Sequence, residues 1–149
     1  MRPSDSARDP FVRGARLFDG EKFFEAHEAW EERWLVETDP AWKTFLQGLI
    51  QVAAGLHKRV VTGDRESAVR LLGKGLAKLE ACPEGIAAEA LGRFCDGVRA
   101  CAAAIARESP DEGNERLGPL PVCGVLVPEL VDHEALLGSH LDEKRHRDE

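Results

Sequence analysis

The sequence of 149 residues contains no tyrosine, a single methionine and no apolar run long enough to cross a membrane. A bilayer-spanning helix needs about 20 consecutive apolar residues, so we expect no membrane insertion. Residues 1–9 are polar and lack the apolar segment of a secretory signal. We therefore expect a cytoplasmic protein.

Cysteine is scarce, and positive charge does not gather in one place. The four cysteines are Cys82, Cys95, Cys101 and Cys123, and no two have the spacing of a zinc site or of a redox pair. We expect reduced thiols and no metal. The formal net charge of −7 opposes phosphate backbones, so no nucleic-acid partner is expected. Nucleotide-binding and nucleophile-elbow motifs are missing as well, and we expect no cofactor.

The chain does have clear signals for where helices begin and end. Asp9-Pro10 and Asp39-Pro40 each place a capping side chain before a proline at the first helical position. Asp64 follows a Thr-Gly turn, and Cys82-Pro83 interrupts a helical pattern. We predict an all-α fold, an antiparallel bundle of about five helices over residues 10–19, 21–37, 40–61, 64–81 and 84–108.

The expected organisation is one bundle domain with less regular ends. Residues 1–9 are predicted to be flexible and residues 10–108 to form the bundle. Prolines and glycines break up the region 109–141, which we expect to be an irregular arm with a short helix packed on the bundle, before a disordered tail at 142–149. A weak echo between residues 20–26 and 63–68 suggests paired hairpins like those of tetratricopeptide repeats.

The most informative segment is residues 23–34. Helical spacing places one stripe toward the core, formed by Phe23, Ala26, His27, Trp30 and Trp34. A second, solvated side carries Glu25, Glu28 and Glu32.

A histidine in an apolar stripe needs a polar partner, because burying an unpaired imidazole is costly. Glu31, one turn after His27, can supply it; Glu28 is less well placed. Three interpretations remain open. His27 could be a hydrogen-bonded core histidine. It could line a binding or catalytic pocket with Glu28 and Glu31, floored by Trp30. It could also contribute to a metal site, although Glu31 stands where the zinc-hydrolase pattern has its second histidine.

A second segment, residues 45–58, combines an apolar face with two glycines and two glutamines. Gly48 and Gly55 lie two turns apart, which predicts a close helix contact, and we expect it against the helix that carries Trp30. Gln47 and Gln51 flank that face and could join His27 and Glu31 in a buried polar network, or merely satisfy His27 and the indole nitrogens. His57, near the helix end, is interpreted as structural.

Together these segments resemble an uncharacterised prokaryotic family, the domain of unknown function 309. The resemblance rests on Leu17-Phe18-Asp19-Gly20, then Phe24-Glu25-Ala26-His27-Glu28-x-Trp30-Glu31, then Leu46-Gln47-Gly48-Leu49-Ile50-Gln51-x-Ala53, and covers roughly residues 10–80. It implies a small helical bundle and no particular activity. The motif positions are His27, Glu28, Trp30, Glu31, Gln47, Gly48 and Gln51.

Three hypotheses about function follow. We favour a binding or interaction module that holds a small polar ligand or a protein partner. The first alternative is a hydrolase or lyase that uses His27 and Glu31, with or without a metal. The second is a purely structural role for the motif. A homodimer is also compatible with the sequence.

Overall fold

The computed structural model describes residues 9–82 and 88–108, and every regular element within them is helical. The elements are α2 (Pro10–Asp19), α3 (Phe23–Val36), α4 (Pro40–His57), the π-helix η1 (Lys58–Thr62), α5 (Arg65–Glu80) and α6 (Ala88–Ala106). The prediction of an all-α bundle is confirmed. The proposed flexible N-terminus, arm and tail lie outside the described residues, apart from Asp9.

Three helices begin where the sequence predicts, because an aspartate caps each of them. The Asp9 carboxylate accepts a hydrogen bond from the Phe11 amide at 2.8 Å, and Asp39 accepts one from Ala41 at 2.9 Å. Asp64 accepts one from Ser67 at 3.0 Å, and this bond lowers the pKa of the Asp64 carboxyl.

Two predicted boundaries are corrected. α3 begins at Phe23 rather than at residue 21, because Glu21 adopts a positive φ of 63° in the turn after α2. The α-helix that starts at Pro40 ends at His57 rather than at residue 61. The chain continues as a wider π-helix over Lys58–Thr62, which ends at Gly63 with a φ of 70°.

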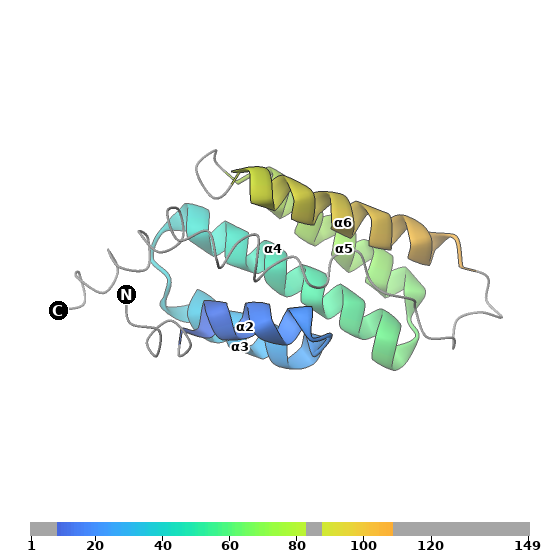
Figure 1. The fold of residues 1–149 in the computed structure, drawn as a ribbon, viewed down its shortest axis with the longest axis horizontal. Helices are drawn as coiled ribbons and strands as arrows, with labels where there is room; N and C mark the ends of the chain where they lie inside the picture. The colour runs from blue at the N-terminus through green and yellow to red at the C-terminus, as the bar shows by residue number, and fades with distance from the viewer. Residues whose placement is uncertain (1–8, 83–87, 109–149) are drawn as a thin grey trace.

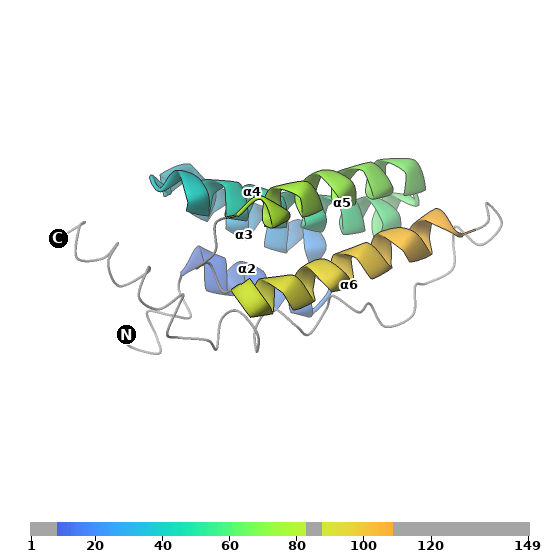
Figure 2. The same ribbon diagram turned by 90° about the horizontal axis from the view of Figure 1, so that it is seen from above.

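Consecutive α-helices run antiparallel, and α4 lies at the centre of the bundle (Figure 1). Figure 1 shows α2 and α3 along one side of α4, with α5 and α6 along the other. In Figure 2, α4 and α5 form one layer, and α2 and α6 lie opposite it. The most extensive interfaces join α4 to α5, α3 to α4, α2 to α3 and α5 to α6.

The two glycines of α4 do produce a close helix contact, but against α5 rather than against α3. A Cβ atom at Gly48 would lie 2.9 Å from Leu79, and one at Gly55 would lie 3.1 Å from the Ala68 carbonyl oxygen. Gly75 of α5 completes the contact, since a Cβ there would lie 2.7 Å from the Gly48 carbonyl oxygen. The expected partner was wrong because α4 is apolar toward both neighbours, and glycine spacing does not distinguish them.

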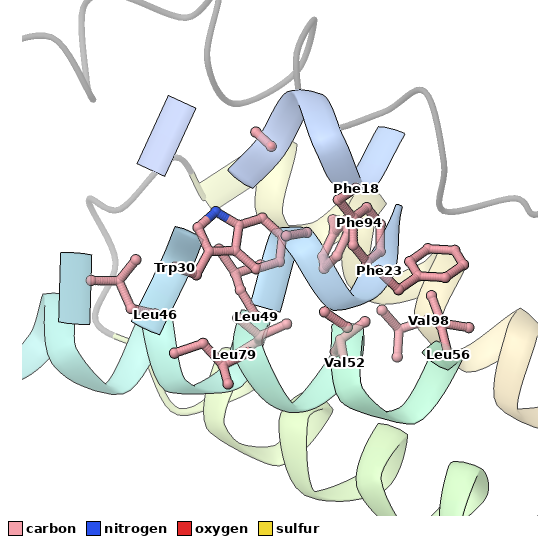
Figure 3. Packing of buried hydrophobic residues seen from close by; sticks show 14 of the residues in the cluster. Phe18, Phe23, Trp30, Leu46, Leu49, Val52, Leu56, Leu79, Phe94 and Val98 are labelled. Carbon is pink, nitrogen blue, oxygen red and sulfur yellow. The ribbon is translucent and has the colours of Figure 1, made fainter. Parts of the chain in front are cut away.

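Trp30 fills the space between α2, α3 and α4. Its indole nitrogen donates a hydrogen bond to the Phe11 carbonyl oxygen at 3.1 Å, and its ring lies 5.6 Å from that of Phe18. Figure 3 shows the indole above Leu46 and Leu49, with the rings of Phe18, Phe23 and Phe94 grouped beside it. The ring lies directly over Gly14, where a Cβ atom would approach its nitrogen to 2.4 Å.

Two ion pairs, the first buried and the second partly buried, lie at helix ends. Arg33 Nη2 lies 2.8 Å from Glu37 Oε1 at the end of α3. Arg59 of η1 donates from Nε to Glu108 just beyond α6, at 2.7 Å, and Arg65 donates to the Glu108 carbonyl oxygen. The second arrangement ties the π-helix to the end of α6.

Candidate functional site: the α3–α4 seam

His27 lies at the border between the buried and the exposed sides of α3. Ala26 and Trp30 are fully buried, whereas Glu28 and Glu31 are exposed. The His27 side chain retains 27% of its surface. The two tryptophans of α3 therefore do not seal this imidazole in the core, nor does it stand free in solvent.

Two ring contacts show which residues of α3 and α4 meet on the outer surface. At one end, the Phe24 ring lies 5.5 Å from the His57 ring. At the other, Lys43 Nζ lies 3.9 Å from the centre of the Trp34 ring, a cation–π contact. Because the two helices are antiparallel and touch at both points, the residues of α3 between these points lie beside those of α4. We call this line the α3–α4 seam, formed by Phe24, His27, Glu31 and Trp34 of α3 with Lys43 and His57 of α4.

The polar pair at the middle of the seam is incomplete. Glu31 Oε2 lies 3.8 Å from His27 Nδ1, a charge contact that is too long for a hydrogen bond. His27 Nδ1 is itself buried and has no hydrogen-bond partner. On its other side the imidazole stacks on Phe24, with ring centres 6.4 Å apart and an interplanar angle of 15°. The imidazole is held in place by aromatic contact more than by hydrogen bonding.

The other motif residues do not form the single polar network that the sequence suggested. Gln51 is turned toward α5, where its side-chain oxygen accepts a hydrogen bond from Lys78 at 2.8 Å. The Trp30 nitrogen is bonded to α2, so neither glutamine is needed to satisfy it. Gln47 is exposed one turn after Lys43, beside the seam, and Glu28 is exposed on α3. α4 has α3 on one side and α5 on the other, and the step of about 40° between the two glutamines turns Gln51 toward α5 while Gln47 stays exposed.

Sequence reasoning missed two residues of the seam, Phe24 and Lys43. Phe24 is 49% exposed and lies off the core stripe of α3. Its place on the helical wheel, among the glutamates, was the available signal: an aromatic ring on a solvated side calls for an explanation. Lys43 carried no comparable signal, because its cation–π contact depends on the register between α3 and α4.

Metal and thiol chemistry finds little support in residues 9–82 and 88–108. No three His, Cys, Asp or Glu side chains gather there as a metal site would require. Burial raises the pKa of the Cys95 thiol to about 11 and also raises that of Cys82, which disfavours the reactive thiolate. None of the described helices is long and apolar enough to span a bilayer.

Comparison with known proteins confirms the family resemblance and adds no activity. Residues 11–71 match the model of a family described as Domain of unknown function (DUF309). Searches of curated proteins and of solved structures found no significant match. The matched region runs from α2 into α5 and contains the whole α3–α4 seam.

Proposed function

We propose that the protein is a binding module and that its contact surface is the α3–α4 seam. The observation that carries the proposal is the half-exposed Phe24 ring, which lies between the imidazoles of His27 and His57. A large exposed apolar ring is unfavourable in water, and a ligand that covers it removes that cost.

The seam has a rigid foundation, which suits binding. Trp30 of α3 is fully buried and hydrogen-bonded to α2, so α3 cannot easily rotate about its axis. At the other end of the seam, the Lys43 ammonium group lies over the Trp34 ring and adds a cation–π contact. A preorganised surface loses little conformational entropy when it binds.

The hydrolase or lyase alternative has less support. A general base and the carboxylate that orients it are expected within about 3.2 Å of each other, whereas His27 and Glu31 are 3.8 Å apart. The six residues of the seam include no serine, threonine or cysteine that could act as a nucleophile. No specific observation favours catalysis over binding.

A thermal-shift screen of polar metabolites and peptides tests the proposal. We expect a ligand that raises the Tm of the unmutated protein but not that of His27→Ala or Phe24→Ala. Arg70→Ala, on the exposed side of α5, is the matched control and should respond like the unmutated protein. Circular dichroism establishes that each variant is folded. A ligand that stabilises all four proteins equally would place the binding surface elsewhere and refute the seam.

A further inference from the structure

The outward side of α3 carries an apolar residue at each end and acidic residues between them. Phe24, Glu28, Glu31 and Leu35 follow one another at intervals of four, three and four residues, and all are exposed. We call these four the outer stripe. With a rise of about 1.5 Å per residue, its two apolar ends lie roughly 16 Å apart. Phe24 is 49% exposed and Leu35 is 70% exposed.

Residues 9–82 and 88–108 leave the negative charge along this stripe largely uncompensated. Glu25 and Glu32 flank it and are also exposed. Within the described part of the chain, Arg13 pairs with Glu32 at 2.6 Å, and Glu31 has only the contact with His27. Glu25 and Glu28 take part in no ion pair with any described residue. Excess carboxylate charge on an exposed helix attracts cations and repels phosphates.

We propose that the outer stripe binds a basic peptide segment, with apolar side chains on Phe24 and Leu35 and a lysine or arginine between them, near Glu28 and Glu31. This inference rests on the proposed function, because it names the partner of the same surface. Complementary charge identifies the partner as cationic, and a guanidinium or ammonium group can also lie over the Phe24 ring.

The spacing of the anchors separates a peptide from other cationic ligands. Two apolar anchors roughly 16 Å apart are beyond the reach of a small organic cation, but three turns of an amphipathic helix span them. Anionic lipid surfaces and nucleic acids present phosphates, which the glutamates repel. A basic segment of another protein satisfies both the charge and the length.

The test begins with a displayed library of random peptides, each about three to four helical turns long, selected at low salt on the full-length protein. We expect the enriched peptides to contain lysine or arginine flanked by apolar residues. The most enriched peptide is then synthesised, and its Kd is measured by fluorescence anisotropy. The double variant Glu28→Gln/Glu31→Gln should weaken binding about tenfold or more, and added salt should weaken binding to the unmutated protein.

Matched variants separate this inference from the proposed function. Leu35→Ala should weaken binding as well, while Glu66→Gln, at an exposed position of α5, should leave the Kd unchanged. If Phe24→Ala abolishes binding but the double glutamine variant binds normally, the seam is a binding surface and the basic partner is refuted. If no enriched peptide depends on Phe24 either, the peptide proposal fails, and the thermal-shift screen alone decides whether the seam binds a small polar ligand.

A second copy of the chain is the competing occupant of the stripe. Light scattering coupled to size-exclusion chromatography, at the concentration used for the peptide measurements, decides between them. We expect the mass of the unmutated protein to equal that of Leu35→Ala. A dimer that dissociates in Leu35→Ala or Phe24→Ala would show that self-association covers the stripe and would overturn the peptide proposal.

Discussion

Arg33 and Glu37 connect the end of α3 to the start of α4. One carboxylate oxygen of Glu37 lies 2.8 Å from Arg33 Nη2, and the other accepts hydrogen bonds from the amides of Thr38 and Asp39. The pair is buried, while Arg33 Nη1 has no hydrogen-bond partner. When one partner of a buried ion pair is removed, the other charge stays buried without compensation, and this is the main cost of the loss.

Replacing Arg33 should therefore be costly. Arg33→Met keeps most of the apolar stem but removes the guanidinium that faces the buried Glu37 carboxylate. We expect the free energy of unfolding to fall by about 3–5 kcal/mol in urea titrations. The control is Arg13→Met, which removes the exposed pair with Glu32 and should cost less than about 1 kcal/mol.

A double variant gives the converse result. Arg33→Met/Glu37→Gln removes the buried negative charge together with the guanidinium, and the side-chain amide oxygen introduced at position 37 can still accept from the two backbone amides. This variant should recover part of the lost stability. If it is less stable than Arg33→Met alone, the buried carboxylate is not the cause of the loss.

At the scale of the helix, the contact between α4 and α5 depends on glycines that have different surroundings. Gly75 faces the backbone of α4, whereas Gly73, two residues earlier, has nothing within 4 Å of a Cβ atom. Backbone atoms cannot move aside as the end of a flexible side chain can. The same substitution should therefore have opposite effects at the two positions.

Gly75→Ala should destabilise the protein by about 1–3 kcal/mol, because the added methyl group forces α4 and α5 apart. Gly73→Ala should instead stabilise it by roughly 0.5–1 kcal/mol, since alanine has the higher helix propensity. Thermal and urea unfolding of the two variants measure both effects. Equal changes at the two positions would mean that the helices do not meet at Gly75.

The sequence predicted helix starts better than helix neighbours. Starts are local: Asp9, Asp39 and Asp64 each bond to an amide two or three residues away, so the capping residue is enough. The partner of Gly48 and the direction of Gln51 depend on which helix lies beside each side of α4. That is a property of the packed bundle, and the pattern of a single helix does not contain it.

At the scale of the whole molecule, the difference between local signals and packing explains why the candidate site was predicted only in part. The sequence singled out His27 and Glu31 and identified their shared edge of the helix. The role of Phe24 and the contact of Lys43 with Trp34 become visible only when α3 and α4 are placed in register. Motif residues that share a sequence signature thus divide between the seam, the exposed surface beside it, the core and the contact with α5.

The order of the helices has a kinetic consequence. Every extensive interface between the described helices joins neighbours in the chain, so each closes a short loop at low entropic cost. Such local topologies refold in about a millisecond or less. Stopped-flow tryptophan fluorescence should show one fast phase, and a dominant phase of seconds would contradict this. During synthesis, each helix can pack on its predecessor as soon as it leaves the ribosome, whereas the contact of Phe18 with Phe94 has to wait for α6.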